Sequence, residues 1–239
     1  MNNAFIRSKA VFGDDGQLKL NNSHVAIFGL GGVGSYAVEA LVRAGVGEFT
    51  LIDNDVYSTS NLNRQLYATV NTIGALKTET AKNRILEINP LAKVNVINKF
   101  ILEGDDSIDF TKFSYVIDAI DTVSGKMHII KKCKSLGVSV ISCMSAGNKL
   151  DATKFMVADL FKTKACPLCK VMRKLCKDAG IVELKVVYSE EEPIKINDES
   201  FLNNELKGNR PAPCSVSFVP SVMGLIAGGE VIKDIVGIL

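Results

Sequence analysis

Two hydrophobic periods alternate along the first part of the chain. Short β-branched and apolar runs predict strands at residues 25–28, 49–52, 94–97, 115–119 and 138–142. Apolar residues at helical spacing predict helices at residues 35–44, 77–88 and 124–136. Strands that alternate with helices build a mostly parallel sheet with helices on both faces. The pattern therefore predicts an α/β, Rossmann-like fold.

The alternation is weaker in the last third of the chain. Residues 155–160 and 185–188 predict two more strands, residues 167–177 predict a helix, and Pro220 begins a last apolar helix. The polar stretch 189–214 predicts a long crossing loop, and loops of that length are often functional.

This change divides the chain into two predicted parts. Residues 1–147 hold the N-terminal segment and a Rossmann-like nucleotide-binding domain. Residues 148–239 form a smaller C-terminal extension that is expected to pack on the same sheet and to complete the substrate site.

A glycine-rich turn follows the first predicted strand and precedes the first predicted helix. The sequence Gly29-Leu30-Gly31-Gly32-Val33-Gly34 satisfies the G-x-G-x-x-G pattern. Gly29 allows the tight turn, Gly31 lets phosphate oxygens approach the backbone, and Gly34 lets the helix pack against the strand. Asp53 ends the second strand, at the spacing where an acid binds a ribose hydroxyl. These residues predict a nucleotide site.

Further polar residues favour ATP over a dinucleotide. They are Asp55, Asn61, Arg64, Gln65, Lys77 and Asp121. Arg64 and Lys77 can neutralise a triphosphate. Asp121, at the carboxyl end of a strand, can hold Mg²⁺ with phosphate oxygens completing the shell. An NAD-dependent oxidoreductase and a non-catalytic nucleotide binder remain alternatives.

The glycine turn and these polar residues together resemble the ubiquitin-activating-like adenylyltransferases, also called the ThiF/MoeB/HesA family. The resemblance implies that Asp53 binds the ATP ribose and that Asn61, Arg64 and Lys77 bind its phosphates. It implies a metal role for Asp121. It also implies that Arg7, in Phe5-Ile6-Arg7, reaches across a homodimer interface to the partner's ATP.

Segments 147–153, 159–173 and 187–191 are similar to the tRNA threonylcarbamoyladenosine dehydratases, a branch of that family. The branch implies a tRNA substrate whose threonyl carboxylate is activated with ATP and then cyclised with loss of water. The alternative is an adenylyltransferase that activates the C-terminal glycine of a ubiquitin-like sulfur carrier. A sulfur-relay or cysteine-desulfurase partner is also possible on this resemblance. Cys166-Pro167 departs from the branch, which tends to have an acid before the proline.

The cysteines bear on the alternative, because sulfur-carrier activators usually hold zinc with two Cys-x-x-Cys pairs. This chain has one pair, Cys166 and Cys169, and a four-thiolate site would have to recruit Cys176 and Cys214 at unusual spacings. We therefore expect the pair to be two structural cysteines on one helical turn, without zinc.

Composition and charge exclude two classes of protein and reveal a cluster of basic residues. Hydrophobic residues make up 47% and charged residues 23% of the chain, which excludes a largely disordered protein. Because no apolar run is long enough for a spanning helix and no signal peptide is recognisable, we expect a cytoplasmic protein without stable membrane insertion. The net charge is only +2, but basic residues gather in one short span that fits a tRNA substrate. They are Lys162, Lys164, Lys170, Arg173, Lys174 and Lys177. A solvated helix face would show the same pattern.

Overall fold

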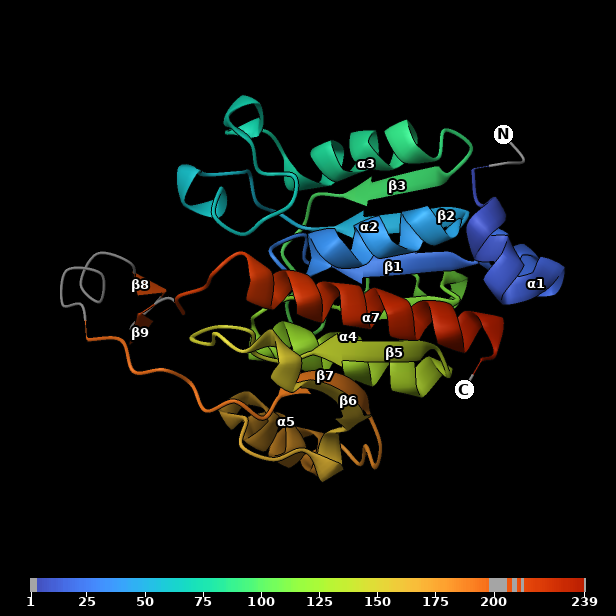
Figure 1. Ribbon diagram of the computed structural model, residues 1–239. Coiled ribbons are helices and arrows are strands. Elements are labelled where there is room, and N and C mark those ends of the chain that lie inside the picture. The colour runs from blue at the N-terminus through green and yellow to red at the C-terminus, as the bar shows by residue number, and fades with distance from the viewer. Residues whose placement is uncertain (1–3, 198–205, 208–209, 212, 239) are drawn as a thin grey trace.

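The computed structural model describes residues 4–197, 206–207, 210–211 and 213–238. Its centre is a seven-stranded sheet in the order β3-β2-β1-β4-β5-β7-β6 (Figure 1). The strands are β1 His24–Phe28, β2 Glu48–Ile52, β3 Lys93–Ile97, β4 Tyr115–Asp118, β5 Ser139–Cys143, β6 Phe155–Asp159 and β7 Lys185–Ser189. All neighbours pair in parallel except β6, which is antiparallel to β7.

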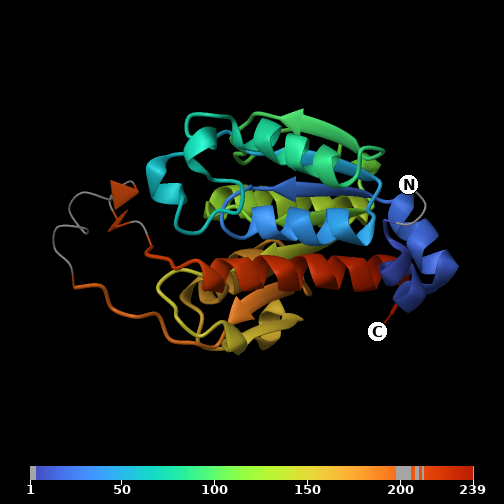
Figure 2. The same ribbon diagram turned by 45° about the horizontal axis from the view of Figure 1, so that its top comes forward.

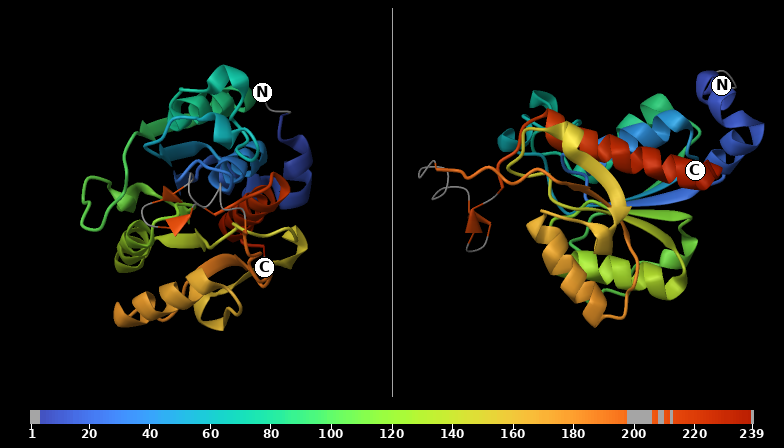
Figure 3. Two further views of the ribbon diagram at one scale, coloured as in Figure 1. Left: turned by 90° about the vertical axis from the view of Figure 1, so that its left-hand side faces the viewer. Right: turned by 60° about the horizontal axis from the view of Figure 1, so that its bottom comes forward.

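Helices cover both faces of this sheet (Figure 3). One face carries α2 Gly34–Ala44, α3 Lys77–Ile88 and α7 Phe218–Val236, and the other carries α4 Val123–Leu136 and α5 Pro167–Asp178. The helix α1 Ile6–Asn21 lies at the end of the sheet where the strands begin (Figures 1 and 2). Short 3₁₀ turns are η1 Thr59–Asn61, η2 Val70–Thr72, η3 Phe110–Lys112, η4 Ala152–Lys154 and η5 Leu160–Lys162. The short strands β8 Leu206–Lys207 and β9 Arg210–Pro211 pair antiparallel with each other.

Each face of the sheet has its own apolar core. Leu41, Ile85 and Met223 belong to the core under α2, α3 and α7, whereas Ile129 and Met172 belong to the core under α4 and α5. Strands buried on both faces read as nearly continuous apolar runs, which is why they are visible in the sequence.

The helices α2 and α7 cross at unusually close range. A Cβ atom added to Gly224 would lie 2.1 Å from the Val33 carbonyl oxygen, and one added to Gly228 would lie 2.8 Å from Ala40 Cβ. Glycine is required where backbones approach this closely. This contact joins the last helix of the chain to the helix that follows the glycine turn.

The structure confirms the predicted fold class and every predicted strand, with bounds shifted by at most one residue. The sequence did not predict helix α1, the antiparallel direction of β6 or the short β8–β9 pair. Helix α1 lacks a regular apolar period and contains Gly13 at φ 76°. The antiparallel direction of β6 cannot be inferred from a short apolar run, because periodicity does not encode strand direction.

Residues 148–239 extend the same sheet through β6 and β7, and the division at residue 147 stays a prediction. Part of the predicted loop 189–214, namely residues 198–205, 208–209 and 212, lies outside the described residues. Among the described helices, none combines the length and apolar character that a membrane crossing requires.

Candidate active site

A pocket of about 820 Å³ lies where β1, β2, β4 and β5 end. Ligands of open parallel sheets bind outside the carboxyl ends of the strands. The pocket is lined by the glycine turn, the segments that follow β2, β3, β4 and β5, and parts of η1, α5 and α7. Its size suits a nucleotide.

The glycine turn has the geometry that its sequence predicts. Gly29 has φ +87°, in the left-handed region that favours glycine. A Cβ atom on Gly34 would lie only 1.8 Å from the Gly29 carbonyl oxygen, so α2 can begin here only with glycine. Gly31 faces open space, with Gln65 Nε2 as the nearest atom at 3.9 Å from a hypothetical Cβ. Gly32 also lines the pocket, beside Pro220.

Asp53 fixes the turn that it faces. Its Oδ2 accepts a hydrogen bond from Leu30 N at 2.7 Å, and its Oδ1 accepts one from Asp55 N at 2.9 Å. Asp55 in turn accepts a hydrogen bond from Lys77 Nζ at 2.8 Å. The Lys77 side chain is only 6% exposed, so its ammonium group is buried against a single carboxylate at the pocket wall. A phosphate would offer this ammonium a second anionic partner.

The polar loop around η1 supplies the next group. Arg64 Nη1 donates to the Ser60 carbonyl oxygen and to Asn63 Oδ1, both at 2.8 Å, and this keeps the guanidinium at the pocket. Asn61 also lines the pocket and caps η1 through a hydrogen bond from Ser58 N. Gln65 is 7% exposed, and its Oε1 has no hydrogen-bond partner among the described residues.

Asp121 lines the same pocket from the segment that follows β4. The structure thus brings together the sequence-predicted residues from Gly29 to Asp121, apart from Gly34, which packs behind the turn. Arg7 does not join them. It is exposed on α1. Helix α1 lies where the strands begin (Figure 1), whereas the pocket lies where they end. Its predicted role therefore depends entirely on a second chain.

A further wall of the pocket comes from the end of β5 and from the C-terminal part of the chain. It includes residues 143–147, Leu168, Pro213 and Ser215. Asn148, at φ 57°, binds this wall together, because its N–H donates to the Cys214 carbonyl oxygen and its Oδ1 accepts from Cys214 N at 2.7 Å. Burial raises the pKa of the Cys143 thiol to about 12, so this cysteine stays protonated and is a poor nucleophile at neutral pH.

The arrangement has clear relatives among known proteins. The ThiF family pattern matches residues 5–238. This chain belongs to the ThiF family.

Several ThiF-family relatives are similar over most of the chain. The tRNA threonylcarbamoyladenosine dehydratase of Bacillus subtilis strain 168 is 41% identical over 239 residues, which cover 97% of this chain and 94% of that protein. The Escherichia coli K12 protein of the same name is 37% identical over 176 residues, 72% of this chain and 65% of that protein.

Two solved structures have folds similar to that of this chain. The crystal structure of the E. coli tRNA N6-threonylcarbamoyladenosine dehydratase in complex with ATP matches with a TM-score of 0.86 and 30% identity, covering 98% of this chain and 93% of that chain. The E. coli MccB structure with ATP matches with a TM-score of 0.65 and 20% identity, which shows a shared fold.

The ThiF-family pocket also contains residues that sequence reasoning missed. Lys99, Phe100 and Ile101 follow β3 and line the pocket. Phe100 is 47% exposed, which is high for an aromatic side chain beside a pocket. The position of these residues directly after the strand at 94–97 was the available signal, because neighbouring parallel strands end at the same edge of the sheet.

Both cysteines of the Cys-x-x-Cys pair are buried at the start of α5, as expected of structural cysteines. Cys166 is the N-cap, and its sulfur accepts a hydrogen bond from Cys169 N at 3.5 Å. The hydrogen bond from the Cys169 side chain to this sulfur is the largest influence on the Cys166 thiol and lowers its pKa. Among the described residues, no group of three or more His, Cys, Asp or Glu side chains is placed to hold a metal ion.

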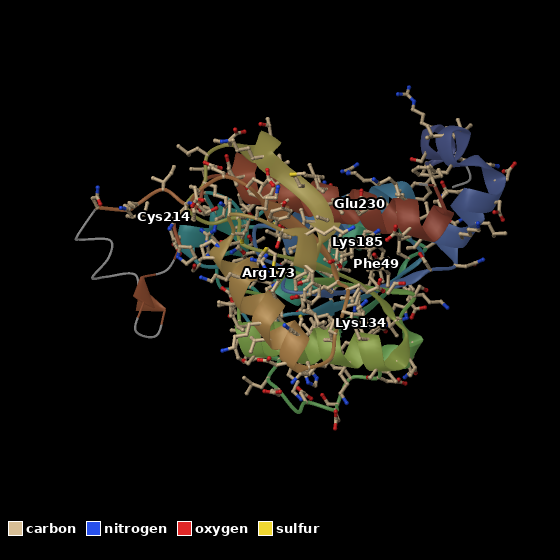
Figure 4. The ribbon with its side chains drawn as sticks, turned by 90° about the horizontal axis from the view of Figure 1, so that it is seen from below. Phe49, Lys134, Arg173, Lys185, Cys214 and Glu230 are labelled. Carbon is tan, nitrogen blue, oxygen red and sulfur yellow. The ribbon has the colours of Figure 1, made fainter. Side chains whose placement is uncertain are left out.

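The predicted basic cluster lies on α5 and the turn before it. Its lysines are exposed, and within the described part of the chain none has an acidic partner. Arg173 differs from them, because it is half-buried and donates to the Thr163 carbonyl oxygen at 2.9 Å (Figure 4). Leu168, in the first turn of the same helix, lines the pocket. The cluster therefore begins beside the candidate active site.

Proposed function

We propose that this protein is an ATP-dependent tRNA threonylcarbamoyladenosine dehydratase. One observation carries the proposal. The residues predicted to bind ATP converge on one pocket, in a fold that matches the ATP-bound E. coli dehydratase over 98% of the chain. The 41% identity to the B. subtilis dehydratase, across nearly the whole chain, supports the same activity.

In this proposal each part of the pocket has a role toward ATP. Backbone N–H groups of the glycine turn and the N-terminus of α2 bind phosphate oxygens. Asp53 binds the ribose, and Asn61, Arg64 and Lys77 bind the phosphates. Gln65 and Asp55 line the same pocket, where Asp55 holds Lys77 in place. The cations oppose the negative charge that grows on the departing pyrophosphate.

Asp121 is the residue that would hold Mg²⁺. Mg²⁺ in nucleotide sites needs only one or two carboxylates, since phosphate oxygens and water complete its octahedral shell. Asp121 is exposed and lines the same pocket as Lys77, so the residues fit this ion. Bound there, Mg²⁺ would neutralise phosphate charge.

The chemistry follows from the weakness of a carboxylate as an electrophile. An oxygen of the threonyl carboxylate attacks the ATP α-phosphate, forms an acyl adenylate and displaces pyrophosphate. A nucleophile in the same substituent then attacks the acyl carbon, closes a ring, loses its proton and displaces AMP. The net change in the nucleoside is the loss of one water. Because ring closure is intramolecular, it needs no catalytic cysteine.

Three further parts of the proposal concern partners and setting. The enzyme acts as a homodimer in which Arg7 reaches the ATP of the second chain. The lysines of the α5 cluster bind tRNA phosphates. The protein works in the cytoplasm, where its tRNA substrate is found. A sulfur-relay or cysteine-desulfurase partner stays a prediction from the family resemblance.

The decisive experiment is mass spectrometry of nucleosides from tRNA that carries threonylcarbamoyladenosine. The tRNA is incubated with the protein, ATP and Mg²⁺, and parallel samples lack ATP or the protein. The proposal expects an ATP-dependent loss of one water from the modified nucleoside, with release of AMP. An unchanged nucleoside would refute it. AMP–pyrophosphate exchange that requires a diglycine-tailed carrier protein would assign the chain to the sulfur-carrier activators instead.

A further inference from the structure

A fully buried ion pair lies behind the pocket walls. Lys126 Nζ is 3.2 and 3.1 Å from the two Asp118 carboxylate oxygens, and the two side chains are 1% and 0% exposed. Lys126 Nζ also donates to the Cys143 carbonyl oxygen at 2.6 Å. Ser142 Oγ donates to Asp118 Oδ2 at 2.5 Å, and Ile120 N donates to Asp118 Oδ1 at 3.3 Å.

This cluster connects three elements at one point. Asp118 is the last residue of β4, Ser142 and Cys143 end β5, and Lys126 lies near the start of α4. The segments that leave β4 and β5 from this point line the pocket: residues 119–122, which include Asp121, and residues 143–147. The ion pair itself does not line the pocket.

A buried ion pair is a poor device for stability alone. Removing two charges from water costs several kcal/mol per ion, and well-packed apolar residues of similar volume often stabilise a fold at least as well. The location of this pair indicates what it does instead. Its hydrogen bonds join the wall that carries Asp121 to the wall formed by residues 143–147.

We propose that Asp118 and Lys126 are positioning residues that align Asp121 with the wall formed by residues 143–147. The proposal rests on the proposed function for its turnover assay. Asp121 faces the ATP phosphates in that scheme, and residues 143–147 line the same pocket. Misalignment of the two walls would therefore slow the chemical step more than it would weaken ATP binding, because Arg64 and Lys77 are held by other contacts.

The test compares breaking the pair with removing it. Lys126→Met leaves the Asp118 carboxylate buried without its cation and should lower the melting temperature by on the order of 10 °C. The double variant Asp118→Asn, Lys126→Met removes both charges and should recover most of that loss. If the pair positions the site, the double variant still has a kcat lower by up to about 10²-fold, while its affinity for ATP measured without Mg²⁺ is nearly unchanged.

A matched control uses the other end of the same strand. Tyr115 starts β4, and its hydroxyl donates to Asp234 at 2.6 Å. Asp234 pairs with Lys185, which lies beside Glu230 (Figure 4). Tyr115→Phe removes one partly buried hydrogen bond at the opposite end of β4 from the pocket. Ser142→Ala removes one hydrogen bond to Asp118. Each single variant thus loses one hydrogen bond, and the two differ in whether that bond lies beside the pocket.

A wild-type kcat in a stable double variant would overturn the proposal. If the double variant does not recover stability, the single variants test the proposal instead. A lower kcat for Ser142→Ala than for Tyr115→Phe supports positioning, and equal kcat values overturn it. A second readout is independent of tRNA: Mg²⁺ should strengthen ATP binding in calorimetric titrations of the wild type but not of the double variant. If the wild type gains affinity with Mg²⁺ but does not dehydrate the nucleoside, the proposed function fails while the positioning proposal can still be judged.

Discussion

The crossing of α2 and α7 gives the sharpest prediction about stability. An alanine at Gly224 would place its Cβ 2.1 Å from the Val33 carbonyl oxygen and 2.9 Å from Tyr36 Cβ. Neither neighbour is the flexible end of a side chain, so the helices must separate. Overpacking of this kind costs about 1–3 kcal/mol or more, while the better helix propensity of alanine returns up to about 1 kcal/mol. We expect a net loss of about 2 kcal/mol for Gly224→Ala.

The matched control lies five residues further along the same helix. A Cβ atom at Gly229 would meet nothing within 4 Å, so Gly229→Ala should stabilise the protein by up to about 1 kcal/mol. The two variants then differ by roughly 3 kcal/mol, or about 6–12 °C in melting temperature for a chain of this size. Thermal unfolding followed by circular dichroism measures the difference. A Gly224→Ala variant as stable as Gly229→Ala would refute the close-packing argument.

The remaining predictions concern chemistry, assembly and charge. Asp121→Ala should abolish ATP-dependent turnover with little change in melting temperature, and mixing it with Arg7→Ala subunits should restore some activity if sites are shared across a dimer. Burial raises the pKa of Glu39, but hydrogen bonds from the arginines of α2 and α3 outweigh it and lower the pKa overall. The stabilisation by Glu39 is therefore fully present above the unfolded pKa of about 4.3 and is lost as pH falls from there through the lower folded pKa, so the stabilities of wild type and Glu39→Gln from urea titrations should converge as the solution is acidified through this window. Replacing Lys170 and Lys174 by alanine should weaken tRNA binding and reduce its salt dependence by roughly one unit of log–log slope each, as filter binding at several salt concentrations would show.

The predictable part of the site is local in sequence. The glycine turn occupies a few residues between a strand and a helix, and its requirements, such as the 1.8 Å approach at Gly34, act within that unit. Asp53 and Asp121 could be placed because each follows a strand, and parallel strands end at one edge. Sequence alone located these residues at the pocket without any knowledge of strand order.

The parts that were missed depend on packing between distant segments. Helix α1 is held against the last helix, where a Cβ atom on Gly16 would lie 2.8 Å from Val236 Cγ1. No local period signals such a contact. The Asp118–Lys126 pair escaped notice for a related reason: Lys126 reads as an ordinary helical lysine, and only the tertiary structure shows that it is buried.

The close contact between α2 and α7 also constrains how the chain acquires its structure during synthesis. Helix α2 ends at Ala44, whereas α7 begins at Phe218, so most of the protein leaves the ribosome before the two can meet. Until then the side of α2 that α7 covers is open to water. Contacts between such distant segments form slowly, and exposed apolar surface makes the incomplete chain prone to aggregation. We therefore expect nascent chains that stop before residue 218 to depend on chaperones for solubility.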